Sequence, residues 1–338
     1  MRNCLPPPLN LILWETIGRG YMHKALLYTL GVLILLGVIG IDFFCPYRYD
    51  QQFEDQSYHP PQITTAYRNV NPALKIYEPD PKTQVEWDFF VKGYKYSFLG
   101  FTCNRHLFAR TKGKPLFLLG SDQFGRDVFS RLVWGARISI TVAFVGVAAT
   151  FVLGLMLGGI AGYCGGLTDR IIMRLCEVLM SFPFFFLMLA LRGVFPSSMT
   201  SVQMYLCIIV LMSLVSWPGL ARVIRGMVLS IKERDFVLAM RCAGMGHARL
   251  IRCYILPHTY AYAFVAALLN IPAYILAEAG LSFLGLGIQD PYSSWGNMLQ
   301  AVMNVTVLQQ YPWMLVPGIA LFVTVLLMFV CGERLRKS

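Results

Sequence analysis

The ionisable residues with the most scope for chemistry lie inside long apolar segments. Glu278 falls within the apolar stretch 260–287, and Glu177 follows Arg174 by three residues in another such stretch. A charge inside a membrane span is costly, so by default it indicates a functional site. Arg174 and Glu177 are expected to pair on one helix face. For Glu278, two interpretations stay open: it lines a transport pathway together with Ser282, or it makes a satisfied hydrogen bond between helices.

No motif for bond-breaking chemistry accompanies these residues. The sequence contains no GxxxxGK[ST] loop, no GxGxxG after a strand, no HExxH and no nucleophile–base arrangement. Its nine cysteines and five histidines lack the spacing of a zinc site, so no metal or cofactor is expected on this chain. A disulfide between Cys45 and Cys103 stays open. We therefore do not expect this chain to hydrolyse ATP by itself.

The composition indicates a membrane protein. Of 338 residues, 56% are hydrophobic and only 14% are charged, whereas soluble domains carry about 25% charged residues. The net charge of +11 would suggest nucleic acid in a soluble protein, but in a membrane protein it follows from which loops face the cytoplasm. No nucleic-acid partner is expected.

The apolar segments predict an all-α polytopic fold. A spanning helix needs about 20 mainly apolar residues, and about six segments qualify. They are 25–44, 138–161, 174–195, 202–219, 260–287 and 312–331.

Positive charge predicts the orientation of these segments. Outside the long stretch 45–137, nearly all Lys and Arg lie on the side of the N-terminus, in 1–24, in the turn 162–174, in the loop 220–259 and in the tail 332–338. Because Lys and Arg concentrate on the cytoplasmic side, both termini are predicted to be cytoplasmic. The stretch 45–137 then becomes an extracytoplasmic loop with an elbow region, and 138–331 forms the main transmembrane domain.

The stretch 45–119 is expected to form a docked cap after the first helix. Seven prolines argue against long regular helices there, while its many aromatic residues argue against a disordered linker. Two roles stay open for it, binding of a partner or passive contact with the membrane surface.

Small residues at four-residue steps predict close helix packing within 138–166. The series is Gly146, Thr150, Gly154, Gly158, Gly162 and Gly166. Such GxxxG steps let a second helix backbone approach in lipid, and we expect Gly154, Gly158 and Gly162 to do so inside this chain rather than at a subunit interface.

The loop 220–259 is the most informative segment. Apolar positions at helical spacing run from Val223 to Met240, Gly244 and Gly246 interrupt them, and Leu250 to Leu256 resume. This pattern predicts two short amphipathic helices joined at a glycine. Its seven basic residues are compatible with binding to anionic lipid. A cytoplasmic helix–glycine–helix is equally suited to docking a soluble partner.

Five ordered blocks resemble the inner-membrane permease subunits of binding-protein-dependent ABC importers, and specifically the C-type permease of the dipeptide, oligopeptide and nickel group. They are GSDQFGRDVFSRLVWGARISI at 120–140, GYCGGLTDRIIMRLCEVLMSFP at 162–183, WPGLARVIRGMVLSIKERDFVLAMRCAG at 217–244, ILPH at 255–258 and ILAEAGLSFLGLGIQDPYSSWGNML at 275–299. FFVKGYKYSFLG and HLFA, upstream of these blocks, resemble the long loop of peptide permeases.

The resemblance assigns an ATPase-coupling role to the loop 220–259. In that family this loop carries the EAA motif, whose glycine joins the coupling helices that seat on an ATPase subunit. The matching positions here are Ala239, Gly244, Leu256 and Pro257, and Arg241 lies between them. Leu238, Met240 and Tyr254 depart from the general motif.

The same resemblance implies the partners and the mechanism. A second homologous permease, two ABC ATPases that bind ATP and Mg²⁺, and an extracytoplasmic binding protein would complete the importer, surrounded by membrane lipid. Transport would proceed by alternating access. Peptides are the expected cargo, with nickel or another small solute as the alternative. A secondary carrier that uses Glu278 without ATP is the rival class.

Overall fold

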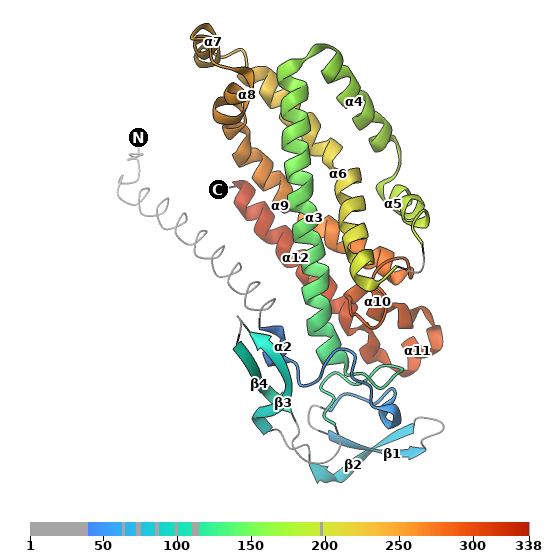
Figure 1. Cartoon of the computed structure of the whole chain (residues 1–338). Coiled ribbons are helices and arrows are strands. Elements are labelled where there is room, and N and C mark those ends of the chain that lie inside the picture. The colour runs from blue at the N-terminus through green and yellow to red at the C-terminus, as the bar shows by residue number, and fades with distance from the viewer. Residues whose placement is uncertain are drawn as a thin grey trace, which may run out of the picture.

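The fold is built from long helices arranged side by side, with two small hairpins at one end (Figure 1). The computed structural model describes residues 40–62, 65–71, 76–84, 88–98, 101–109, 115–196 and 199–337. Most of the predicted first membrane helix, 25–44, lies outside these residues. Only its end is described, where the short helix α2 spans Ile41–Phe44.

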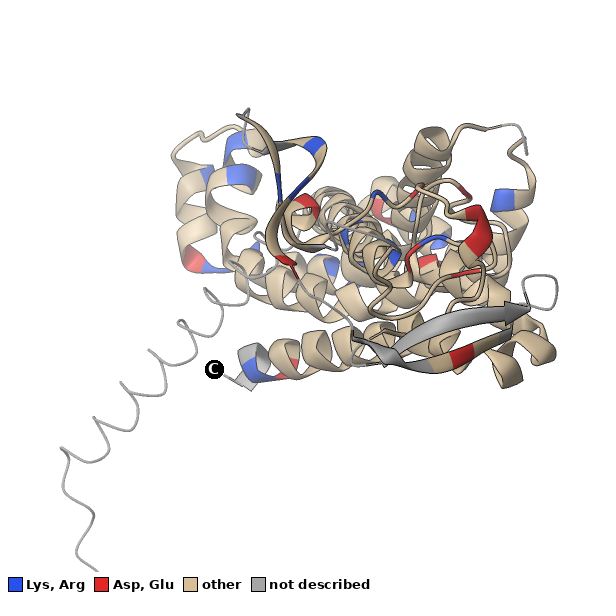
Figure 2. Cartoon of the chain, turned by 90° about the horizontal axis from the view of Figure 1, so that it is seen from below, with Lys and Arg blue, Asp and Glu red and all other residues tan. Residues whose placement is uncertain are grey.

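Four described helices are long and apolar enough to cross a membrane. They are α3 (Val128–Cys164), α6 (Ser201–Ile231), α9 (Pro257–Phe283) and the stretch Pro312–Arg334, which contains η4 (Pro312–Leu315) and most of α12 (Val316–Lys337). They occupy the predicted segments 138–161, 202–219, 260–287 and 312–331. In Figure 2 the helix that ends at the C-terminus is free of charged residues over most of its length, as a lipid-facing wall requires.

The prediction of one helix over 174–195 is wrong. Residues Gly166–Ser181 form α4 and Phe184–Gly193 form α5, and the two are bent by 92° at a short break. Pro183 lies at the break, where it lacks the amide hydrogen that a continuous helix would need. The described residues therefore contain four spans, or five if the bent pair counts as one.

The helix α3 is the central element. Gly154, Gly158 and Gly162 of the series face α6, whereas Gly146 lies against Tyr274 of α9. A Cβ atom on Gly158 would lie 2.4 Å from the backbone oxygen of Ala221, and one on Gly162 would lie 2.8 Å from that of Arg225. At Gly154 the neighbour is the side chain of Leu220. These glycines thus set the distance between two helix backbones. Gly166 departs from the series because it already belongs to α4, where no atom lies within 4 Å of a built Cβ.

Replacing Gly158 with Ala is expected to lower the free energy of unfolding by about 2 kcal/mol, because the new methyl group meets backbone atoms and the helices must separate. Gly226 on α6 has open space around it. Gly226→Ala should therefore be neutral or stabilising by up to about 1 kcal/mol through helix propensity. Denaturation of both variants in detergent measures the difference. Equal stabilities would contradict the close α3–α6 packing.

Two antiparallel hairpins form in the described part of 45–119, which contains no long helix, as the prolines predicted. Strands β1 (Thr65–Asn71) and β2 (Ile76–Gln84) form one, and β3 (Asp88–Phe98) and β4 (Phe101–Ala109) form the other. A single turn, η1 (Glu54–Gln56), precedes them. The all-α description thus fits the membrane part, whereas this segment is β-structured. Cys45 and Cys103 are both free thiols.

Short elements close the end of the bundle that carries the hairpins. After α9, the chain forms α10 (Trp295–Leu299), η3 (Gln300–Met303) and α11 (Val305–Gln310). The opposite end carries α7 (Asp235–Cys242), α8 (His247–Leu250) and the single-turn π-helix η2 (Ile251–Ile255). The two ends therefore hold different kinds of site, separated by the length of α3 (Figure 1).

Candidate functional site

The α7–α8 loop protrudes beyond the long helices and is fastened to them by a small apolar cluster. Val237, Leu250 and Ile255 are fully buried against Ile224 and Val228 of α6. The opposite surface is exposed and includes Leu238, which is 45% exposed, together with Ala239, Arg241 and Gly244. A helix pair that is held by buried contacts on one side and exposed on the other is suited to docking a partner protein.

The expected helix over Val223–Met240 is interrupted in the structure. The helix α6 continues to Ile231, because Ile224, Val228 and Ile231 are buried against the bundle. The α7 helix then starts anew at Asp235. The second expected helix, Leu250–Leu256, is one end of α8 and the π-turn η2, which leads into α9 at Pro257. Proline is tolerated there because the first turn of a helix does not use its amide hydrogens.

Gly244 ends α7 in a conformation that favours glycine. Its φ angle is +76°, in the left-handed region, and no atom lies within 4 Å of a built Cβ. Its amide donates to the carbonyl of Arg241 at 3.0 Å and the amide of Met245 donates to that of Met240 at 3.2 Å. Such hydrogen bonds close a helix C-terminus at a glycine and redirect the chain. Gly244 therefore fixes the angle between α7 and α8.

Polar contacts connect this loop to the far end of α3. Tyr163 and His247 share a hydrogen bond of 2.6 Å, and the guanidinium of Arg241 lies 6.0 Å from the centre of the Tyr163 ring. The ammonium of Lys232 donates to the carbonyl of Gly162 at 3.1 Å. Leu256 packs against Gly159. The loop is therefore in direct contact with α3, through its hydrogen bonds to Tyr163 and Gly162.

Glu278 joins three helices through hydroxyl groups. The Oγ of Ser139 on α3 donates to one carboxylate oxygen at 2.7 Å, and the Oγ of Ser282 donates to the other at 2.7 Å. The Ser139 hydroxyl also accepts from the amide of Trp295 on α10 at 3.4 Å. Glu278 and Ser282 are fully buried. In this conformation Glu278 makes a hydrogen bond between helices, which is the second of the two interpretations left open by the sequence. Arg174 and Glu177 also pair, at 2.8 Å and in an exposed position.

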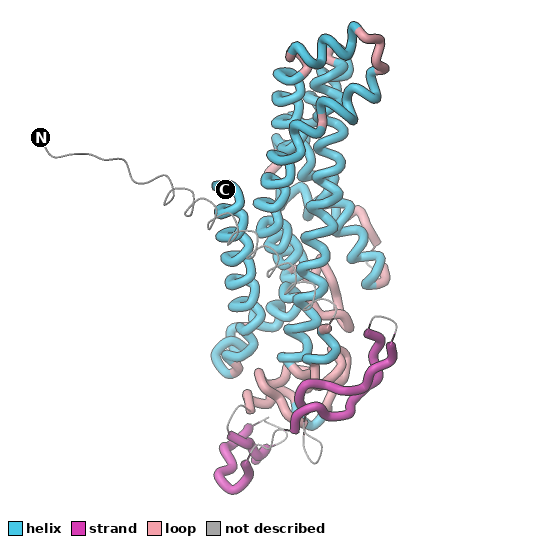
Figure 3. The backbone as a smooth tube through the Cα atoms, turned by 90° about the vertical axis from the view of Figure 1, so that its left-hand side faces the viewer, coloured by secondary structure: helices cyan, strands magenta, loops and turns pink. Residues whose placement is uncertain are grey.

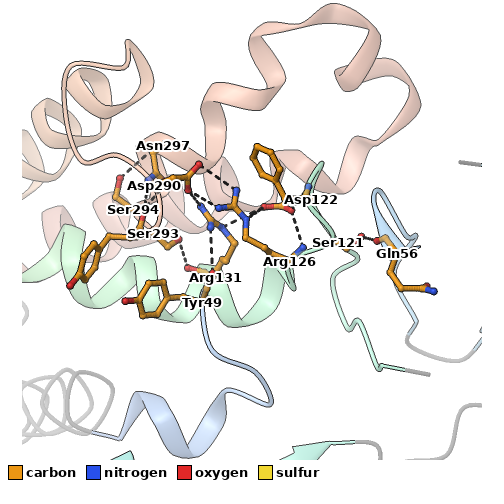
Figure 4. A network of polar contacts seen from close by, with 12 residues as sticks. Tyr49, Gln56, Ser121, Asp122, Arg126, Arg131, Asp290, Ser293, Ser294 and Asn297 are labelled. Atoms are coloured by element: carbon orange, nitrogen blue, oxygen red, sulfur yellow. Dashed lines mark hydrogen bonds and ion pairs between the residues drawn. The ribbon is translucent and has the colours of Figure 1, made fainter. Parts of the chain in front are cut away.

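A charge network at the hairpin end of the bundle was not predicted from the sequence. It joins two arginines and two aspartates, with Arg126 bonded to Asp122 at 2.6 Å and to Asp290 at 2.8 Å (Figure 4). Arg131 on α3 bonds Asp290 at 3.1 Å and lies 3.7 Å from Asp122. Acidic and basic residues alternate at 122, 126, 127 and 131, which is the available sequence signal. The pairing with Asp290 cannot be predicted from local sequence, because Asp290 is more than a hundred residues away from both arginines.

The network has both buried and accessible members. The side chains of Arg126, Arg131 and Asp122 are at most 7% exposed, whereas that of Asp290 is 53% exposed. Partial burial acts to raise the pKa of Asp290, but the charges of Arg131 and Arg126 outweigh it and hold the pKa below its usual range. All four residues border a cavity of about 380 Å³, together with Asn297 on α10 and Gln300 and Met303 on η3. The network therefore ties the start of α3 to the α9–α10 connection.

Asp127, the N-cap of α3, is expected to make stability fall as pH rises through about 6. Burial raises its pKa to about 6 from 3.8, although Ser130 donates to it from both its amide and its hydroxyl. The protonated form is thus favoured in the folded state. As pH rises from about 4 to about 6, the free energy of unfolding should fall by roughly 2 kcal/mol.

The comparison with Asp127→Asn isolates this effect, because the amide keeps an acceptor for Ser130 and does not titrate. The free energy of unfolding of wild type minus that of the variant should decline over this pH range. A difference that is constant with pH would contradict the raised pKa.

Comparison with known proteins identifies the family. The sequence profile of "Binding-protein-dependent transport system inner membrane component" matches residues 154–337, more than half of the chain. The chain belongs to this family. It is a permease subunit of an ABC importer, a transport subunit rather than an enzyme, and a multi-pass protein of the inner membrane.

Three relatives of this permease subunit have names that state a cargo. It is 39% identical over 220 residues to the dipeptide transport system permease protein DppC of Bacillus subtilis, covering 65% of this chain and 67% of the relative. It is 38% identical over 223 residues to the oligopeptide transport system permease protein OppC of Haemophilus influenzae, covering 65% and 68%. The nickel transport system permease protein NikC of Escherichia coli is 36% identical over 223 residues, covering 64% and 76%.

Proposed function

We propose that this permease subunit forms half of a translocation pathway for peptides, with a second homologous permease subunit forming the other half. The names of the dipeptide and oligopeptide relatives support the cargo, and nickel is the alternative that a third relative supports. An extracytoplasmic binding protein would deliver the substrate. The hairpin end of the bundle would then face outward and both termini would be cytoplasmic, in agreement with the distribution of Lys and Arg.

The α7–α8 loop is the proposed dock for an ATPase subunit. The observation that carries this proposal is the shape of the loop, a fixed helix pair with an exposed outer face at the end opposite the hairpins (Figure 1). Ala239, Arg241 and Gly244 lie on the exposed side, while Leu256 and Pro257 lead from the loop into α9. ATP and Mg²⁺ would bind to two such ATPase subunits and not to this chain.

Force would pass from the dock into the membrane part by alternating access. Closure of the ATPases would favour one state of the permease because nucleotide binds more tightly to that state. The hydrogen bond between Tyr163 and His247 and the bond from Lys232 to Gly162 connect the loop to α3, and α6 leads directly into it. Glu278 and Ser282 are proposed to hold α3, α9 and α10 together beside the pathway during this change.

Two experiments test this function. The chain purified from its native membrane in mild detergent should bring with it a second permease and ATPase subunits. Reconstituted with the binding protein, the complex should take up dipeptides or oligopeptides on addition of ATP. Uptake of nickel and not of peptides would show that nickel is the cargo instead. Recovery of this chain alone, with flux that needs no ATP, would overturn the importer reading in favour of a carrier.

A further inference from the structure

The β3–β4 hairpin is fastened to the outer end of the membrane helices. The hydroxyl of Tyr94 on β3 donates to a carboxylate oxygen of Asp42 on α2 at 3.1 Å, and Nδ1 of His106 on β4 lies 2.7 Å from the carbonyl oxygen of Asp42. The ring of Phe108 packs on that of Phe129 in the first turn of α3, with centroids 5.5 Å apart. The hairpin is therefore held beside the start of α3, at the lower end of the helices in Figures 1 and 3.

The hairpin and α2 together expose large aromatic side chains. Phe89 and Phe90 are 66% and 61% exposed, and Phe44 on α2 is 41% exposed. Phe90 has a φ angle of +57°, which costs about 1–2 kcal/mol for a side chain of this kind. Its ring lies 6.3 Å from that of Phe43. The hairpin thus exposes two consecutive phenylalanines near Phe44, and exposed aromatic clusters of this kind indicate an interaction surface.

An apolar groove runs between α2 and β4. Its volume is about 590 Å³, and its lining includes Phe43, Phe44, Tyr96, Cys103, Asn104 and Arg105. Arg105 is the charged residue of this lining, and it is exposed. The groove therefore combines an apolar floor with a single cationic group.

The hairpin carries positive charge for which the described residues supply no ion-pair partner. Lys92 and Arg105 are directly opposite one another in the strand register, and Lys95 lies on the same strand as Lys92. All three are exposed, and no ion pair to them occurs within the described part of the chain. Like charges directly opposite on a hairpin are destabilising unless an anion lies between them. This pair is therefore suited to binding an anionic group.

We propose that the groove between α2 and β4 binds an anionic phospholipid. The acyl chain lies against Phe43, Phe44 and Tyr96, and the phosphate contacts Arg105 with Lys92 across the hairpin. Free phosphate would satisfy the cations but would leave the apolar floor exposed to water, whereas a lipid covers both. The hairpin thereby fixes the outer part of this subunit to the membrane surface.

Hydrogen exchange of the full importer complex in nanodiscs tests this site. One set of discs contains phosphatidylcholine alone and the other adds phosphatidylglycerol. Amides of β3 and β4 should exchange more slowly in the anionic discs, since each basic residue near an anionic surface shifts the bound population by about fivefold. The lipid difference should disappear in the double variant Lys92→Gln/Arg105→Gln. It should persist in Arg48→Gln, which removes an exposed arginine from an ion pair with Asp50 outside the hairpin.

Equal exchange in both discs, or a lipid difference that survives the double variant, would overturn the lipid site. Protection that appears only when the binding protein is added would assign the hairpin to that protein instead. Mass spectrometry of the complex released from anionic discs should find phosphatidylglycerol retained by the wild type and lost from the double variant. Retention by both would also count against the site. None of these results depends on the cargo.

Discussion

Replacing Gly244 with Asp is expected to abolish substrate-stimulated ATP hydrolysis by the assembled importer, while the chain still inserts into the membrane. Among the described residues, no atom lies within 4 Å of a Cβ atom built at Gly244, so a side chain can leave the backbone there without a clash. The added charge therefore projects from the exposed face that is proposed to contact the ATPase. The left-handed backbone at φ +76° adds strain that changes the angle between α7 and α8. Stimulation should fall by at least about tenfold, corresponding to 1.4 kcal/mol or more.

The matched control is Gly166→Asp. Gly166 also has a positive φ, of +58°, and no atom within 4 Å of a built Cβ, but it lies at the start of α4, outside the loop. This variant should keep the stimulation of the wild type. Stimulation at the wild-type level in Gly244→Asp would contradict the proposal that the α7–α8 loop couples to the ATPase. Glu278→Gln should have a smaller effect than Gly244→Asp, whereas the rival carrier predicts the reverse order.

Replacing Arg126 with Gln is expected to lower the free energy of unfolding by about 3–4 kcal/mol. Removal of one partner from a buried ion pair leaves the other charge uncompensated, which typically costs about 3–5 kcal/mol. Asp122 would lose the bond of 2.6 Å, and Asp290 would lose that of 2.8 Å. Arg131 remains 3.7 Å from Asp122, so the effect should fall in the lower part of this range. Denaturation in detergent at neutral pH measures it.

Arg48→Gln is the control for this change. Arg48 also pairs with an aspartate, at 3.1 Å, but its side chain is 54% exposed. Exposed pairs contribute about 0–1 kcal/mol, so the control should be nearly as stable as the wild type. If both variants lose the same stability, the buried network does not fasten the start of α3 to the α9–α10 connection.

Features that depend on neighbouring residues were predictable from the sequence. Runs of apolar residues located the four long described helices, because each residue of a spanning helix must by itself be compatible with lipid. The four-residue spacing of Gly154, Gly158 and Gly162 predicted a close helix contact for the same reason: the period of the helix places them on one face. The ordered sequence blocks also identified the family, which the match over 154–337 confirms.

Local spacing gave less information where two favourable patterns overlap. The apolar series from Val223 to Met240 predicted one helix. In the structure α6 ends at Ile231 and α7 starts at Asp235, so the series is divided between two helices. The apolar stretch 174–195 concealed the bend at Pro183 in the same way, since hydropathy does not distinguish a straight helix from a broken one. For 45–119 the sequence predicted only that long helices are absent, and it did not predict the strands.

Contacts between distant residues were decided only by the tertiary structure. The charge network brings Arg126 and Arg131 to Asp290, which follows them by more than a hundred residues, and no local pattern specifies that pairing. Glu278 was ambiguous for the same reason. A buried carboxylate is costly alone but acceptable with two hydroxyl donors, and Ser139 approaches only because α3 packs on α9. The sequence thus located the four long apolar helices and the protruding loop, whereas the packing of the helices determined which polar groups are satisfied.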